Sequence, residues 1–389
     1  MRIGAELRRQ RLHAKYAWSQ STNPWLVTTR SLVDTRVRPY ISVLSTAGQE
    51  APTIGYAGTW HGTVWILDVL EQRREASGAP TISRKQGTVS RSGLYGGKRA
   101  LPRADLVAVG CAADDVGRLP TNAALVLPYR MHLIVDLSGS GSGEWRKAVS
   151  RRERQWFNAR RNARDLLFEV VSDDDSFNFF YDRMHVPTMR LRHGERARSE
   201  TKQSAYECLF RRGVLGFARI EGERSAGVLC RRDGDVLTVR LLGVRDGAKQ
   251  HHDEGAMKIL YHLMLEWADE NGIRQVDFGA VEPWLSQGIF QWKRRFGPRI
   301  QLAPNHSGNL RVWWRSNRDT PAVRDFLVAN PVFELTGAGD LRAVYFHDDE
   351  RPPRLDLAHT CANNDNFRQI HLDEFLVGHS APSTAEGKR

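Results

Sequence analysis

Three consecutive stretches decide the fold: VLTVRLLGV at 236–244, AMKILYHLMLEWADENG at 256–272 and RQVDFG at 274–279. The first and the third are short, β-branched runs and predict strands. The middle stretch repeats apolar residues at i, i+3, i+4 and i+7 and closes on Asn271-Gly272, which predicts a helix over 254–271. A strand, a helix and a strand in direct succession predict a βαβ crossover with parallel pairing.

Two further strands precede this crossover. VLGFARI at 214–220 and SAGVLC at 225–230 are separated by Glu221-Gly222, and Asp233-Gly234 leads into the strand at 236–244. These turns predict an antiparallel meander. Elsewhere, other apolar runs have strand length, while the Gly/Ser/Arg-rich stretch 76–103 is predicted to be a long exposed loop. The runs are FEVVS (168–172), VWILDVL (64–70), DLVAVG (105–110), MHLIVDL (131–137) and LRVWW (310–314).

Length and composition indicate a globular chain of at least two domains. It has 389 residues, of which 41% are apolar and 26% charged, and these fractions exclude collagen-like, coiled-coil and wholly disordered proteins. No run of about 18 apolar residues predicts a membrane span, and the N-terminal sequence is unlike a signal peptide, so we expect a cytoplasmic protein. The four cysteines form no CxxC pair and are expected to be core thiols.

The net charge of +12 is concentrated in three segments. Residues 1–40 and 144–164 each carry a formal charge of +6, and 290–299 carry +4, so the rest of the chain is acidic. Arg outnumbers Lys 48 to 9, a ratio that GC-rich coding alone produces, and the total charge is therefore weak support for a nucleic-acid partner. The local concentration indicates phosphate recognition instead.

Gly-, Ser- and Pro-containing breaks and changes in composition along the chain predict four segments. These are a basic N-terminal arm broken at Asn23-Pro24, a first α/β domain ending at the Gly/Ser stretch 138–143, a second α/β domain that opens with a basic helix, and a polar tail. The predicted boundaries are 1–40, 41–143, 144–345 and 346–389.

The order of elements in the second domain resembles that of GNAT acyltransferases. Three strings make the resemblance closest to the Fem-type (FemAB/FemX-like) aminoacyltransferases: RRERQWFNARRNARD, FYDRMHVPTMRLRHGERA and WADENGIRQVDFGAVEPWLSQGIFQWKRRFG. The resemblance implies an α/β (α+β) fold of two tandem GNAT-like half-folds, the first degenerate, with mixed sheets flanked by helices.

The same resemblance implies an N-acyltransferase that forms an amide. It would move an acyl or aminoacyl group from acyl-CoA or charged tRNA, as co-substrates, to an amine of a small molecule or peptide. No GxSxG or Cys/His arrangement suggests a covalent intermediate, and no bound cofactor is expected. The resemblance places the CoA pyrophosphate of a GNAT enzyme at the N-terminal turn of the long helix, and here Asp253 and Glu254 occupy that turn, so the sequence favours charged tRNA as the donor and a tRNA partner. Ordinary N-capping by acidic residues is the alternative interpretation of these two carboxylates.

Three residues are the predicted catalytic groups. Lys293 matches the lysine of the Fem FKxxFG-like motif, and an ammonium near the reacting carbonyl stabilises an oxyanion; the alternative is a solvated basic run. Asp277 and Glu282 follow a predicted parallel strand, where α/β sites tend to lie, and either is a candidate to accept the amine proton. The alternatives are a strand-end structural role for Asp277 and an ordinary loop carboxylate for Glu282.

Other residues are candidates for binding. Substrate binding is predicted for Tyr181, His185, Arg192 and His193, since imidazole is a suitable base and Arg can clamp an anion. Donor binding is predicted for Gly255, Ala256, Arg160 and Arg161, at the start of the long helix and on the basic helix. Adjacent His251 and His252 point to different sides of a helix, and no metal site is expected.

Two other classes of protein fit parts of the same pattern. One is a non-catalytic RNA- or ligand-binding protein on a decayed GNAT fold, and the other is a structural module with no pocket. Loss of turnover on substitution of Lys293 and Glu282 separates an enzyme from a binding protein.

Overall fold

The computed structural model describes residues 2–96, 100–139, 143–196, 198–337 and 339–376. These residues form two compact units, and each unit is assembled from separate pieces of chain. The first consists of Met1–Gln20, His132–Gly279 and Lys293–Ile300, and the second of Ser21–Met131, Ala280–Trp292 and Gln301–Arg389. The units therefore alternate along the sequence, whereas the predicted segments follow one another. Residues 140–142 of the Gly/Ser stretch 138–143 lie outside the described residues.

A seven-stranded sheet in the order β12-β6-β11-β10-β9-β8-β7 organises the first unit. Strands β7 to β10 form the predicted antiparallel meander, and β10 pairs parallel with β11. The strands are β6 (Met131–Asp136), β7 (Leu166–Val171), β8 (Gly213–Ile220), β9 (Glu223–Asp233), β10 (Val236–Val244), β11 (Gln275–Val281) and β12 (Arg299–Leu302).

Helices cover both faces of this sheet. On one face, α10 packs on β7 to β10, and Cys230 Sγ lies 3.8 Å from Met264 Sδ of α10. On the other face, Leu229 joins a core cluster with Phe180 and Met184. The helices of the unit are α1 (Arg2–Gln20), α5 (Arg151–Ala163), α6 (Asp174–Phe179), η5 (Phe180–His185), α7 (Val186–His193), α8 (Lys202–Ser204), η7 (Ala205–Leu209), α9 (Lys249–Asp253) and α10 (Ala256–Glu270).

The second unit has a six-stranded sheet, β3-β1-β2-β4-β13-β5, and a three-stranded sheet, β14-β15-β16. Strand β2 pairs parallel with β4, and the helical segment η2–α3 follows β2 along the chain. The strands are β1 (Tyr40–Thr46), β2 (Ile54–Gly58), β3 (Ser83–Val89), β4 (Leu106–Ala112), β5 (Ala124–Pro128), β13 (Leu310–Ser316), β14 (Val332–Leu335), β15 (Leu341–His347) and β16 (Phe367–His371).

Successive side chains of each strand point to opposite faces of the six-stranded sheet, and both faces are buried. Leu106 and Ala108 of β4 belong to one core cluster, whereas Val107 and Val109 belong to another. The principal helices of the unit are α2 (Pro24–Leu32), η1 (Val33–Val37), η2 (Thr63–Leu67), α3 (Asp68–Ala76), α4 (Arg91–Tyr95), α11 (Gly288–Lys293), η11 (His306–Asn309), α12 (Pro321–Ala329) and α13 (Leu372–Leu376).

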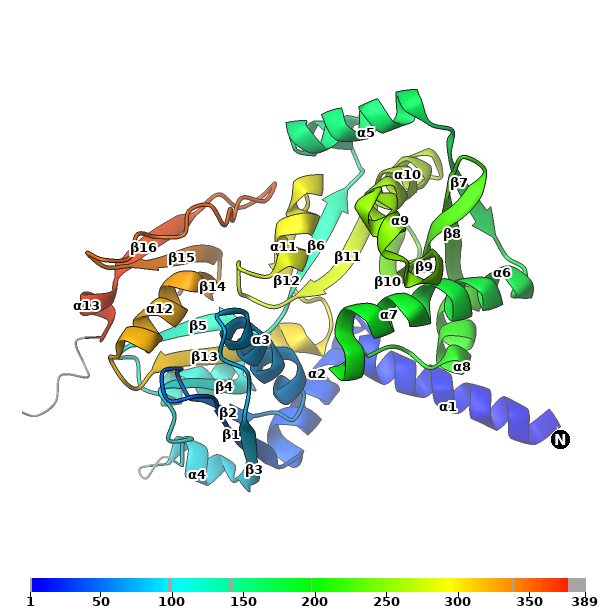
Figure 1. Cartoon of the computed structure of the whole chain (residues 1–389). Helices are drawn as coiled ribbons and strands as arrows, with labels where there is room; N and C mark the ends of the chain where they lie inside the picture. The colour runs from blue at the N-terminus through cyan, green and yellow to red at the C-terminus, as the bar shows by residue number, and fades with distance from the viewer. Residues whose placement is uncertain (1, 97–99, 140–142, 197, 338, 377–389) are drawn as a thin grey trace, which may run out of the picture. The chain divides into compact units, whose positions relative to one another are not determined.

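Both units thus combine antiparallel strands with a parallel pair whose strands are separated in the chain by helical segments, β10 with β11 in the first unit and β2 with β4 in the second (Figure 1). In the second unit β15 also pairs parallel with β16. The predicted α/β class, with mixed sheets flanked by helices, is confirmed. The break at Asn23-Pro24 is also confirmed, because the Asn23 side chain accepts hydrogen bonds from the backbone amides of Trp25 and Leu26 and starts α2 there.

Three local predictions differ from the structure. Residues 64–70 are helical, in η2 and α3, because a short buried apolar run has the same pattern in a strand and in a helix. The predicted loop 76–103 contains the exposed edge strand β3, which is held by backbone pairing with β1. The segment assigned to a polar tail carries β16 and α13, and 377–389 lie outside the described residues.

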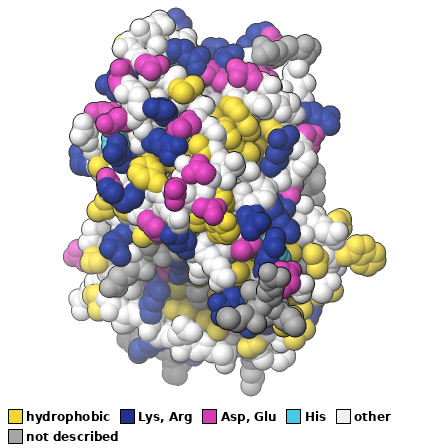
Figure 2. Space-filling model, turned by 90° about the vertical axis from the view of Figure 1, so that its right-hand side faces the viewer, with side chains coloured by type: hydrophobic (Ala, Val, Ile, Leu, Met, Phe, Trp, Pro, Cys, Tyr) yellow, Lys and Arg dark blue, Asp and Glu magenta, His cyan; other side chains and the backbone are white. Residues whose placement is uncertain are grey.

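The surface is mixed in charge. Figure 2 shows Lys and Arg side chains interspersed with acidic and apolar side chains over the face it presents. All four cysteines are buried and free, as predicted. None of the described helices combines the length and the apolar character that a membrane span requires.

Candidate active site

The parallel strands β10 and β11 separate soon after they begin. Pairing joins Val236, Leu237 and Thr238 with Gln275, Val276 and Asp277, and the register contains no further pair of these strands among the described residues. A bulge between Val239 and Leu241 redirects β10 at the same level. Diverging strands leave backbone donors and acceptors for a ligand, and Asp277 is the last residue of β11 in the register with β10.

Asp277 is paired with a histidine that is not among the predicted site residues. Its Oδ2 lies 2.6 Å from Nδ1 of His132, and its Oδ1 accepts a hydrogen bond of 2.8 Å from the backbone amide of Gly279. Both side chains are buried, and they come from β11 and its neighbour β6. The only sequence signal was one polar residue inside the apolar run MHLIVDL, which a buried histidine needs a partner to satisfy.

Lys293 reaches the same strand end. At the end of α11, its Nζ donates a hydrogen bond of 2.5 Å to the backbone oxygen of Phe278, the residue after Asp277, and the side chain is buried. Phe296, three residues after Lys293, packs edge-on against Phe278. The structure therefore brings two of the three predicted catalytic residues to the same end of β11: Asp277 belongs to the strand, and Lys293 bonds the backbone of the next residue, Phe278.

Glu282 has a separate environment within the second unit. Its Oε1 forms an ion pair of 3.3 Å with Arg130, and its Oε2 accepts a hydrogen bond of 3.2 Å from Gln287. The Arg130 guanidinium lies over the Trp65 ring, 4.0 Å from its centroid. These contacts account for the burial of Glu282, and its predicted catalytic role stays a prediction.

The predicted donor-binding residues meet around Trp156 of α5. Gly255, with φ of +82°, precedes α10, and a Cβ there would lie 2.5 Å from the Trp156 ring. Arg160 and Lys258 stack on the same ring at 5.0 and 4.1 Å. Trp156 therefore covers the residue before α10, where a pyrophosphate would bind to backbone amides.

The other two predicted donor residues are engaged within the first unit. Ala256 is fully buried at the start of α10. Arg161 pairs with Glu266 of α10, and Arg146 bonds the other oxygen of the same carboxylate at 3.0 Å. Part of the positive charge of residues 144–164 is thus neutralised internally.

The predicted substrate-binding residues hold a neighbouring chain segment. The Tyr181 hydroxyl donates to the Glu200 backbone oxygen at 2.7 Å. The His185 ring lies between the Leu242 backbone oxygen, 2.9 Å from Nδ1, and the Ser199 hydroxyl at Nε2, and burial lowers the pKa of His185. Arg192 lies 3.1 Å from Nδ1 of His252, and the His193 side chain is outside the described part of the chain. Their predicted roles stay predictions.

A group with the composition of a metal site lies in the second unit. Oxygen and nitrogen atoms of Asp34, His61 and His306 lie within 4.8 Å of one another. The cation among them is Arg30, whose Nε donates to Asp34 Oδ2 at 2.7 Å and whose Nη2 donates to His61 Nε2 at 2.9 Å. The Arg30 guanidinium uses acceptor atoms of Asp34 and His61 that would otherwise be available to a metal ion. The four side chains therefore form a hydrogen-bonded network among themselves.

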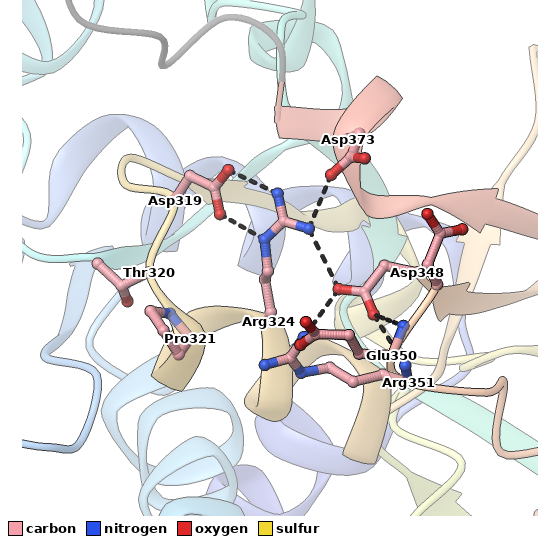
Figure 3. Close-up of a pocket in the computed structure, with 9 residues that line it drawn as sticks. Asp319, Thr320, Pro321, Arg324, Asp348, Glu350, Arg351 and Asp373 are labelled. Atoms are coloured by element: carbon pink, nitrogen blue, oxygen red, sulfur yellow. Dashed lines mark hydrogen bonds and ion pairs between the residues drawn. The ribbon is translucent and has the colours of Figure 1, made fainter.

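A surface pocket of the second unit is similarly self-contained. It has a volume of about 430 Å³ and lies beside α12, where Arg324 contacts Asp319, Asp348 and Asp373 (Figure 3). Arg351 bonds Asp348 as well, at 3.0 Å. Both arginines of the lining are thus bonded to carboxylates of the same lining.

Comparisons with known proteins place the candidate site in a recognised domain. Residues 146–294 match the family model described as an acetyltransferase (GNAT) domain. Residues 146–294 form a GNAT domain. Its match spans β7 to β11 and Lys293, so the predicted acyltransferase domain is confirmed at this level. No curated protein matches the chain.

Solved structures show distant similarity. L-PGS from Bacillus licheniformis is 13% identical, with 79% of this chain and 96% of that chain covered and a TM-score of 0.35. FemX is 12% identical, with the same two coverages, 79% and 96%, and a TM-score of 0.37. A GCN5-related N-acetyltransferase from Sphaerobacter thermophilus is 11% identical over 72% of this chain and 77% of that chain, with a TM-score of 0.26.

Proposed function

We propose that the protein is an amide-forming acyltransferase that moves an acyl or aminoacyl group from an activated donor to an amine. The observation that carries this proposal is the position of Asp277 and Lys293 in a GNAT domain, where β10 and β11 diverge. Backbone groups of the diverging strands suit an acyl carbonyl, and the Lys293 ammonium suits the negative charge of a tetrahedral intermediate.

The donor is proposed to be charged tRNA rather than acyl-CoA. Acyl-CoA binding in the GNAT manner would place a pyrophosphate at the first turn of α10, where Trp156 covers Gly255 and where Glu254 adds negative charge. Either Trp156 moves or the donor binds elsewhere. A charged tRNA carries its ester on a ribose and has no need of this turn, and exposed arginines of α5 are available for its phosphates.

The experiment offers the purified protein radiolabelled acyl-CoA or aminoacyl-tRNA, with a panel of small-molecule and peptide amines. We expect label transfer from aminoacyl-tRNA that ribonuclease abolishes. Transfer from acyl-CoA in the presence of ribonuclease would overturn the donor assignment while retaining the reaction class. RNA binding without transfer from either donor would favour the non-catalytic alternative.

Lys293→Met is the variant that tests the chemistry. It removes the ammonium and retains much of the side-chain volume, and loss of an oxyanion donor costs about a hundredfold or more in kcat. His371→Asn, a partly exposed position of β16 in the second unit, is the matched control and should leave transfer unchanged.

A further inference from the structure

His132 lies outside the segment that matches the GNAT family. It is in β6, which precedes residue 146 in the chain, yet β6 is inserted between β12 and β11 of the sheet. A strand from the preceding part of the sequence therefore adds an imidazole to the GNAT domain at Asp277.

The hydrogen bonds of Asp277 define which ring nitrogen of His132 carries the proton. Oδ1 accepts the Gly279 amide and Oδ2 faces Nδ1 at 2.6 Å, so an ionised carboxylate accepts at both oxygens. The proton of a neutral imidazole then lies on Nδ1, and Nε2 keeps its lone pair. The His132 side chain retains 9% of its surface exposed.

The dyad is located at the divergence of the two strands. Phe278 packs against Tyr261 of α10, so Asp277, one residue earlier, projects from the opposite face of the sheet. Asp277 is also the last residue of β11 that pairs with β10. The imidazole and the opened strand edge therefore occupy the same level of the sheet.

We propose that His132 is the general base of the transfer reaction and that Asp277 is its positioning residue; this rests on the proposed function. The amine nitrogen attacks the acyl carbonyl carbon, a C–N bond forms, and the nitrogen gives its proton to Nε2 of His132. The tetrahedral intermediate collapses, the bond to the leaving oxygen or sulfur breaks, and the imidazolium returns the proton to the leaving group. The products are an amide and the free alcohol or thiol.

Asp277 acts through the histidine because both of its oxygens already accept hydrogen bonds. Nor does the mechanism require proton transfer by Lys293, whose ammonium donates to Phe278 O. Asp277 orients the His132 imidazole and leaves its Nε2 to accept a proton, as the Asp-His pair does in a Ser-His-Asp triad. The attacking nucleophile here is the substrate amine and not a serine of the protein.

The test uses three variants of the full chain in the donor–acceptor assay. His132→Asn keeps a donor near Asp277 but has no base, and we expect kcat to fall by about 10²- to 10⁴-fold with KM changed less than a few fold. His132→Ala should lose as much, and added imidazole should restore part of its rate. Asp277→Asn should lower kcat because the amide favours the other tautomer of His132.

Imidazole rescue separates catalysis from structure, since a free base repairs a proton-transfer defect but not a misfolded sheet. Transfer at the wild-type rate by His132→Asn, or an unrescued His132→Ala that remains folded by circular dichroism, overturns the role of His132. If the wild-type protein transfers no label, the proposed function fails instead. Nitrogen-15 NMR gives a further readout: a proton on Nε2 at neutral pH also overturns the assignment.

Discussion

His61 and His306 are histidines that the fold holds neutral. Burial, the Arg30 guanidinium and His306 lower the pKa of His61 to about 3, and burial and Arg30 lower the pKa of His306 to about 4. In the unfolded chain each returns to an ordinary value near 6.5. Below that pH the unfolded state binds more protons than the folded state, so stability falls as the pH falls.

We therefore expect the second unit to be destabilised by acid. The free energy of unfolding should be constant above pH 7 and decrease below about 6.5, by up to about 2 kcal/mol for each histidine at pH 5. Urea denaturation at pH 7.5 and pH 5 measures this slope. His61→Asn and His306→Asn should each flatten it, and an equal slope in both variants and the wild type would contradict the interpretation.

Lys293 illustrates how a predicted site residue acquires a second role. Its buried ammonium satisfies the Phe278 backbone oxygen, so Lys293→Met should lower the free energy of unfolding by about 1–3 kcal/mol in addition to its effect on transfer. Lys293→Arg keeps the positive charge but changes the length and shape of the side chain. Compared with Lys293→Met, it should recover more of the free energy of unfolding than of the transfer rate. Urea denaturation of both variants measures the structural component alone.

At the scale of elements, the start of α10 depends on one close contact. Gly255 has a positive φ, and a Cβ there would lie 2.5 Å from Trp156. Gly255→Ala should lower stability by about 2–4 kcal/mol, from backbone strain together with overpacking. Gly272→Ala is the matched control, since its φ is +70° but a Cβ added there would meet no atom within 4 Å, and it should cost only about 1 kcal/mol.

A double variant separates the cost of backbone strain at Gly255 from the cost of overpacking against Trp156. Trp156→Ala removes the ring, so Gly255→Ala in that background should cost no more than Gly272→Ala. Thermal denaturation of the four proteins gives the coupling energy. Additive losses would show that Trp156 does not press on this turn, and would remove the steric objection to pyrophosphate binding there.

Element identity was largely predictable, whereas sheet membership was not. The alternation and turn residues of 214–244 predicted β8, β9 and β10, and the periodicity of 254–271 predicted α10, because these signals are local. MHLIVDL was also predicted as a strand, but its place beside β11 depends on a pairing with residues more than a hundred positions away. His132 was missed for that reason.

The candidate site shows the same limit. Lys293 was predicted because it matches the Fem FKxxFG-like motif, and Asp277 because it lies at the end of a predicted parallel strand. Arg30, by contrast, occupies the position of a cation among Asp34, His61 and His306, which come from three separate segments, and no spacing in the sequence relates them. The local sequence pattern identifies candidate residues within one helix or strand. Their contacts depend on how distant segments pack in the folded chain, which the pattern does not contain.

At the scale of the whole molecule, the alternation of the chain between its two units affects how it can be divided. The predicted boundary at 143/144 separates β6 from the sheet in which it lies between β12 and β11. Leu133, Ile134 and Val135 of β6 are buried, and each such side chain contributes about 1.5–3 kcal/mol. Their sum is comparable with the total stability of a domain, about 5–15 kcal/mol.

We therefore expect a fragment spanning 130–302 to unfold cooperatively and a fragment spanning 144–302 to lack a cooperative transition. The two differ only by the segment that contains β6, so the comparison isolates this strand. Both lack α1, which contacts η7 in the first unit, and any loss from that source is common to the pair. Thermal denaturation followed by circular dichroism provides the measurement. A cooperative transition in the shorter fragment would show that the GNAT segment folds without β6, and would leave His132 as an addition to a domain that is complete without it.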